Sequence, residues 1–260
     1  APAISSLARS SGSALGPVSA KLIPQDDLPP SGTRSLFDHL LAQNDGLPYP
    51  FEKLVTLVQR QAPEDAQPLA VMIPLGRSLL KGSADFEHPR VVFAADYQGA
   101  NTDAALGLAP RGQLFLGFTE DANEIEVISY NELAGRYEFQ LVQNYCEGCV
   151  PRIVYARRAI CQTCHQGGSP IFSVRPWQET NGQPEITRRI VEARGDKPYL
   201  AVEPAQPLSS PERIDELTDI GNFINVTQRV WLDGCGMEGV ECRRLMLKLA
   251  LRFLDDPAAF

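Results

Sequence analysis

The sequence predicts an α+β fold, in which an antiparallel β meander is flanked by N-terminal helices and a helical C-terminal region. Short runs rich in β-branched and aromatic residues follow one another between residues 90 and 159, and most of the turns between them are too short for parallel crossovers. Before and after this stretch, apolar residues recur at helical spacing. Hydrophobic residues make up 43% and charged residues 22% of the 260 residues, as in an ordinary globular protein.

Composition divides the chain into three regions. Residues 1–32 are rich in Pro, Ser, Ala and Gly and predict an extended N-terminal arm. Residues 33–150 hold the first helices and the meander, and residues 151–260 form a mostly helical region that carries the cofactor motif described below. These last two regions could also form one integrated domain.

Two amphipathic stretches open the second region. The first has apolar residues from Leu36 to Leu41 with Ser31 or Thr33 as its N-cap, and the second has them from Phe51 to Val58. Five candidate strands follow, at Arg90–Ala95, Gln113–Thr119, Glu124–Tyr130, Tyr137–Tyr145 and Arg152–Ala159. In the third and fourth of them apolar and polar residues alternate, which predicts a sheet with one buried and one wet face.

Helical signals return in the C-terminal third. One helix starts at Pro184 and ends before Gly195, and another starts at the sequence Ser210-Pro211-Glu212. The last runs from Val240 to Leu254, and its core stripe is expected to be Leu245, Leu249 and Phe253.

The pentapeptide Cys161-Gln162-Thr163-Cys164-His165 is a CxxCH motif. It resembles the haem attachment site of c-type cytochromes, and the resemblance covers these five positions alone. It implies one covalent haem c, bound through thioethers to Cys161 and Cys164, with His165 as the proximal iron ligand. Two alternatives stay open, a redox-active dithiol and half of a zinc site.

The sixth iron position decides much of the function of such a haem. Met237 is the preferred candidate because it stands in a glycine-rich loop, Gly234–Gly239, that a Cys235–Cys242 disulfide would close. The alternatives for the sixth position are Met72, Met246, His39, His88 or no protein ligand. Arg175 and Trp177 follow the motif closely and are candidate partners for the haem propionates.

The remaining four cysteines form an even set, as expected in an oxidising compartment. We favour the local pairs Cys146–Cys149 and Cys235–Cys242, with a site of four thiolates around one metal ion as the alternative. The resemblance to cytochromes c implies a periplasmic location. The start of the chain lacks a charged segment followed by an apolar run, so we expect a mature form without its signal peptide.

Charge and hydropathy restrict the partners. A net charge of −8 without a basic cluster disfavours nucleic acid, and the longest apolar run, around Leu69 to Leu75, is too short to span a membrane. We expect a protein redox partner with a basic docking patch. The predicted function is one-electron transfer by a mono-haem cytochrome. The alternatives are a haem enzyme or ligand sensor with an open distal site, for example a peroxidase, and a disulfide-bonded interaction protein with a structural haem.

Overall fold

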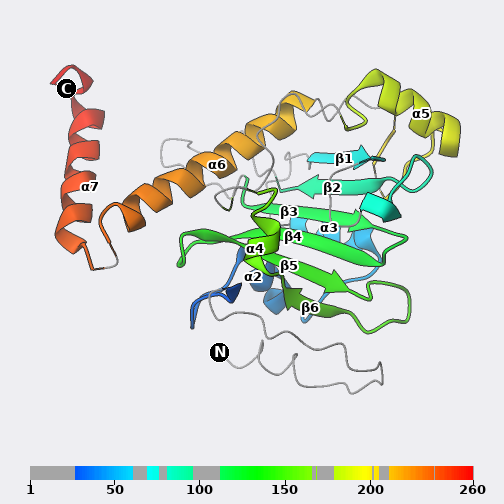
Figure 1. The fold of residues 1–260 in the computed structure, drawn as a ribbon, viewed down its shortest axis with the longest axis horizontal. Coiled ribbons are helices and arrows are strands. Elements are labelled where there is room, and N and C mark those ends of the chain that lie inside the picture. The colour runs from blue at the N-terminus through cyan, green and yellow to red at the C-terminus, as the bar shows by residue number, and fades with distance from the viewer. Residues whose placement is uncertain are drawn as a thin grey trace.

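The sheet is an antiparallel meander of six strands, and helices lie on both sides of it. The computed structural model describes residues 27–60, 69–75, 81–95, 112–165, 168, 179–200, 202–204, 211–236 and 238–259. The strands are hydrogen-bonded in chain order, β1 (Leu69–Ile73), β2 (Arg90–Ala94), β3 (Leu114–Thr119), β4 (Glu124–Asn131), β5 (Arg136–Gln143) and β6 (Arg152–Tyr155). The predicted α+β class is therefore confirmed (Figure 1).

Two of these strands differ from the prediction. β1, which pairs with β2 from Leu69↔Ala94 to Ile73↔Arg90, was not among the five expected strands. The last expected strand ends at Tyr155, and the chain then enters the short helix α4 (Arg158–Cys161). Because β6 comes from the third predicted region and pairs with β5 from the second, the two regions share one sheet.

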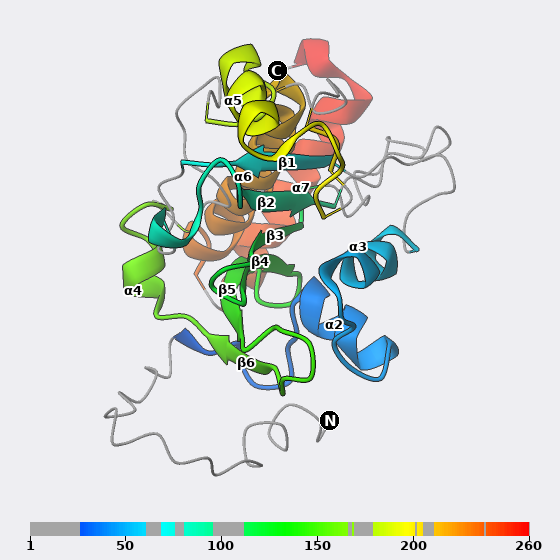
Figure 2. The ribbon, with the colours of Figure 1, turned by 90° about the vertical axis from the view of Figure 1, so that its right-hand side faces the viewer.

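One face of the sheet carries the larger core. Helices α2 (Leu36–Gln43) and α3 (Phe51–Gln59) cover this face, as Figure 2 shows. Buried side chains from both helices pack on those of β2, β3 and β4, and the ring of Phe51 stacks on Phe118 with centroids 4.8 Å apart. The N-cap of α2 is Ser35, not Ser31 or Thr33, because its hydroxyl accepts a hydrogen bond from the backbone N–H of Asp38.

Helix α4 lies on the opposite side of the sheet from α2 and α3 (Figure 2). Helix α6 (Pro211–Asp233) contacts β5. Helix α5 (Pro184–Arg194) has Pro184 in its first turn and Gly195 at its end with φ of +84°, as predicted, and it adds Ile190 to the larger core. Two short 3₁₀ turns, η2 (Lys81–Ser83) and η5 (Pro257–Ala259), complete the described elements.

The last helix, α7 (Val240–Asp255), forms where the sequence predicts it but does not join the core. It projects away from the sheet at the end of α6 (Figure 1). The expected core stripe is exposed to solvent, with Leu245 at 58%, Leu249 at 42% and Phe253 at 51%. The prediction of a buried stripe was wrong because periodicity identifies an apolar face and not the surface that covers it.

Two further expectations concern the chain as a whole. Residues 1–26 of the predicted arm lie outside the described residues, whereas Asp27 is buried against the body of the protein. Among the described residues, none of the helices has both the length and the apolar character that crossing a bilayer requires.

Candidate haem attachment site

The CxxCH motif is wound into a helical turn. The backbone N–H of Gln162 donates to the carbonyl of Arg158 at 2.8 Å, and that of His165 donates to the carbonyl of Cys161 at 2.8 Å. The N–H of Cys164 also donates to the carbonyl of Cys161, at 3.2 Å. In such a turn, side chains three and four residues apart lie on the same side. Cys161, at the end of α4, and Cys164 and His165, in the turn that follows, therefore lie on the same side of one helical turn.

The cysteines separate into two chemical groups. Disulfides join Cys146 to Cys149 and Cys235 to Cys242, the two local pairs that the sequence analysis favours. Cys161 and Cys164 remain free thiols, the first half-buried and the second exposed. No group of three or more Cys, His, Asp or Glu side chains suited to a metal ion occurs in the described part of the chain. The pairing of all four outer cysteines leaves no support for the four-thiolate alternative.

The motif faces β4 and β5. The imidazole of His165 lies beside the ring of Phe139 on β5, with ring centroids 5.6 Å apart and planes inclined by 44°. Burial raises the pKa of the Cys161 thiol to about 11, and the negative charge of Glu126 on β4 adds to this rise, whereas Arg158 opposes it. Cys161 is therefore a neutral thiol near pH 7.

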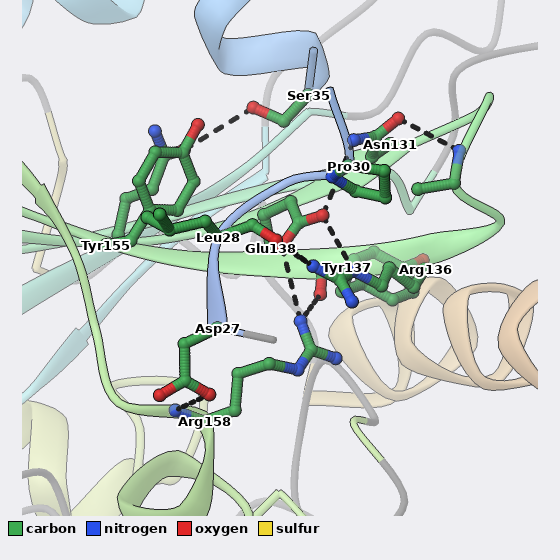
Figure 3. Close-up of polar contacts among 12 residues, drawn as sticks. Asp27, Leu28, Pro30, Ser35, Asn131, Arg136, Tyr137, Glu138, Tyr155 and Arg158 are labelled. Carbon is green, nitrogen blue, oxygen red and sulfur yellow. Dashed lines mark hydrogen bonds and ion pairs between the residues drawn. The ribbon is translucent and has the colours of Figure 1, made fainter. Parts of the chain in front are cut away.

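Arg158 anchors the start of the motif to the edge of the sheet. Its Nη1 donates to the backbone carbonyl of Tyr137 at 2.8 Å and to the carboxylate of Glu138 at 3.3 Å, as Figure 3 shows. Its guanidinium carbon also lies 5.6 Å from the centroid of the Phe139 ring. β6 pairs only with residues 140–143 of β5, so the first half of β5 is not covered by β6. The side chain of Arg158 hydrogen-bonds to this uncovered half of β5.

A buried carboxylate holds the cluster together. Glu138 is 0% exposed and also accepts from Nε of Arg136 at 2.8 Å and from the amide of Asn131 at 3.4 Å. Its charge is therefore balanced by two arginines and a neutral donor.

The N-terminal segment completes the same cluster (Figure 3). The carboxylate of Asp27 accepts from the backbone N–H of Arg158 at 3.2 Å, and Nη2 of Arg136 donates to the carbonyl of Leu28 at 2.6 Å. Arg158 is the first residue of α4, and the N-cap residue Arg157 makes no side-chain cap. Asp27 therefore caps this helix from 131 residues away in the sequence.

The other sequence-predicted site residues are not described by the structure. Arg175, Trp177 and Met237 lie outside the described residues. Gly236 and Glu238, on either side of Met237, belong to the connection between α6 and α7, which Figure 1 shows well apart from α4. These three residues stay predictions.

The alternative iron ligands have other surroundings. His39 is exposed on α2, on the far side of the sheet from α4. Nδ1 of His88 lies 3.7 Å from the carboxylate of Asp121, in the turn between β3 and β4. Met72 is fully buried in the larger core, and the sulfur of Met246 lies 3.3 Å from that of Cys235.

Sequence reasoning missed the residues that hold the motif in place, namely Asp27, Phe139, Glu138 and Arg158. The strand alternation contains one signal for Glu138. Polar residues of β5 occupy the face that elsewhere carries the larger core, namely Arg136, Glu138 and Gln140. They interrupt an otherwise apolar buried face. For Asp27 and Arg158 no local pattern exists, because their contacts join distant parts of the chain.

The residues present fit a covalently attached haem. Two free thiols and a histidine share one helical turn, one thiol is open to solvent, and an aromatic ring lies against the imidazole. No protein-family model, curated protein or solved structure matches this chain. The functional argument therefore depends on the site alone.

Proposed function

We propose that the protein is a periplasmic mono-haem c-type cytochrome that transfers single electrons. The observation that carries the proposal is the helical turn in which Cys161, Cys164 and His165 stand together while the other four cysteines are paired. Haem c would supply a one-electron iron centre at this turn. Cys161 and Cys164 would hold it as thioethers, and His165 would be its proximal ligand.

The state of Cys161 supports this proposal over the redox-dithiol alternative. Catalytic CxxC motifs attack disulfides as thiolates, and their nucleophilic cysteine has a lowered pKa. Here burial raises the pKa of Cys161 to about 11. The histidine one turn after Cys161 stands where a CxxCH motif places the proximal iron ligand.

The surroundings of His165 suit an electron carrier. Phe139 packs against the imidazole, and Arg158 links that ring to the buried Glu138, so the motif is held by a rigid strand. His39 lies on α2, on the far side of the sheet from α4, and His88 lies beside Asp121, so within the described residues no specific observation favours a haem enzyme. The net charge of −8 supports a redox partner with a basic docking patch.

The direct test is whether the motif binds haem covalently. The full chain is produced in a periplasm that carries a haem c maturation system, and haem retained after denaturation is measured as the pyridine haemochrome. We expect one haem per chain, no retained haem in the double variant Cys161→Ala/Cys164→Ala, and full retention in Cys146→Ala/Cys149→Ala. A wild-type chain without haem, or haem retained by the first double variant, would contradict the proposal.

The second test identifies the sixth ligand. The sequence favours Met237 for this position, and Arg175 and Trp177 as partners of the propionates, and for Met237 this ligation would require the connection between α6 and α7 to move from its place apart from α4. His/Met coordination gives a weak absorption band at roughly 695 nm in the oxidised protein. This band should disappear in Met237→Ala and persist in Met72→Leu and Met246→Leu. A high-spin spectrum that shifts on adding cyanide would favour a ligand sensor or enzyme instead.

A further inference from the structure

The arm formed by α6 and α7 carries a large uncovered apolar surface. None of the described α7 side chains is buried, although the helix has 16 residues and is rich in leucine. The large apolar side chains that are exposed on the arm are Phe223, Val226 and Val230 on α6, and Val240, Leu245, Leu247, Leu249, Leu251, Phe253 and Leu254 on α7. The patch therefore follows both helices and is not a set of isolated residues.

These side chains recur at the spacing of a helix–helix interface. On α6 they stand at i, i+3 and i+7, from Phe223 to Val230. On α7, Leu247, Leu251 and Leu254 stand at i, i+4 and i+7. Such stripes pack into the grooves of another helix with a matching stripe. The arm therefore presents two surfaces of the kind that helices bury against each other.

The connection between the two helices keeps these stripes apart within one chain. The disulfide Cys235–Cys242 ties the end of α6 to the first turn of α7. The guanidinium of Arg243 also donates to the carbonyl of Gly236 at 2.6 Å. Figure 1 shows the two helices diverging from this connection rather than packed along each other. Leu247, Leu251 and Leu254 are therefore exposed where a second molecule could cover them.

The charges of the two helices are complementary. The sequence of α7 has four basic residues, Arg243, Arg244, Lys248 and Arg252, against Glu241 and Asp255. The sequence of α6 has five acidic residues against two basic ones. An α7 helix thus fits an α6 helix in apolar spacing and in the sign of its overall charge, and the α6 helix that it does not meet in its own chain is available in another copy.

We propose that two copies of this chain form a dimer through their arms, with α7 of each copy packed on α6 of the other. The contact is reciprocal, as a two-fold interface requires. At ~150–200 Å² for a fully exposed large apolar side chain, the six side chains of the two stripes, which are 50–75% exposed, give on the order of 600 Å² per copy. This lies at the low end of the ~600–1,000 Å² that each partner contributes to a stable interface.

An anionic membrane surface fits the arm less well. It would attract the basic residues of α7 but would repel a chain of net charge −8 with an acidic α6. Burial of α7 in a lipid surface would also leave the stripe of α6 uncovered. A second copy covers both stripes at once.

Sedimentation velocity of the full chain, purified with whatever haem it carries, tests the dimer. We expect twice the chain mass for the wild type. We expect the mass of a single chain for the double variant Leu247→Glu/Leu251→Glu, which places acidic side chains of α7 opposite the acidic α6. We expect the same mass for Val226→Lys, which places a charge in the apolar stripe of α6. The matched control is Leu133→Glu, because Leu133 is 79% exposed in the turn between β4 and β5, outside the arm. It should remain a dimer.

The substituted arm residues are exposed in the monomer, so the variants should keep the far-ultraviolet circular dichroism of a folded chain. A wild type that stays monomeric, or a dimer that survives both arm changes, overturns the proposal. The last part of the test is flotation with phosphatidylglycerol vesicles, compared with phosphatidylcholine vesicles. Binding of a monomer to the anionic vesicles would assign α7 to a lipid surface and overturn the dimer.

Discussion

Replacing Glu138 by glutamine tests whether a buried charge cluster holds the CxxCH motif to the sheet. The substitution keeps the size of the side chain and removes its negative charge. Arg136 and Arg158, which lie 2.8 and 3.3 Å from the carboxylate, then lose their shared counterion. Glutamine keeps one acceptor oxygen and replaces the other by an NH2 donor, so the change removes the charge and one of the two acceptor atoms while keeping the shape.

The size of the effect follows from how deeply each group is buried. The side chain of Glu138 is 0% exposed, and those of Arg136 and Arg158 are 27% and 15% exposed. Removing one partner of a fully buried ion pair costs ~3–5 kcal/mol. Because solvent still reaches both arginines, we expect a loss of about 2–3 kcal/mol in the free energy of unfolding. For a chain of this length that corresponds to roughly 5–10 °C in Tm.

Thermal and guanidinium unfolding, followed by circular dichroism, measure this loss. The matched control is Glu147→Gln, an exposed carboxylate in the turn after β5, which should change stability by less than ~0.5 kcal/mol. Adding Arg158→Met to Glu138→Gln should cost less than the sum of the two single changes, because they share one interaction. A Glu138→Gln variant as stable as the control, or strictly additive effects, would refute the cluster as a structural anchor.

Three further predictions concern other parts of the same region. Asp27→Ala removes the cap of α4 and should lower the free energy of unfolding by ~1 kcal/mol in the same unfolding assay; an unchanged midpoint would contradict the capping role. Burial, with a smaller effect of Glu132, raises the pKa of Tyr130 to about 12, and burial also raises that of Tyr137. Their unfolded pKa is ~10. The contribution of Tyr130 to stability is therefore full below pH ~10 and lost as the pH rises through about 12, and that of Tyr137 is lost at higher pH, which alkaline unfolding followed by phenolate absorbance would detect. Gly117→Ala should leave the free energy of unfolding unchanged or raise it by up to ~0.5–1 kcal/mol, because a Cβ there would meet Oε2 of Glu126 at 3.5 Å, an ordinary contact. A loss of more than ~1 kcal/mol in the unfolding assay would show that the strand cannot accept the methyl group.

The sheet could be predicted from the sequence because its strands carry local signals. In β4, Ile125 and Val127 alternate with acidic residues, and the turns on either side are short. β1 lacks this signal, since four of its five residues are buried and the run does not alternate. A short apolar run of that kind is compatible with a strand or a buried helix segment.

The prediction of the site was limited by the range of its contacts. The CxxCH motif is a local pattern and could be found by inspection. Its supports are not local, since Asp27 and Arg158 are 131 residues apart and Glu138 is 20 residues from Arg158. Helix α7 illustrates the same limit, because its apolar face is visible in the sequence whereas its place in the fold is not.

The same spacing gives two different chemical outcomes in this chain, and the reason lies in the surroundings of Cys161. Cys146 and Cys149 are joined in a tight turn, whereas Cys161 and Cys164, also three residues apart, are free. Disulfide formation starts from a thiolate, and its rate depends on the fraction of thiol that is ionised. With a pKa of about 11, the Cys161 thiol is about 10⁻⁴ ionised at neutral pH. Burial against the sheet and the charge of Glu126 therefore slow any disulfide formation in which Cys161 is the attacking thiolate, which favours the proposed thioether over a redox-active disulfide at this position.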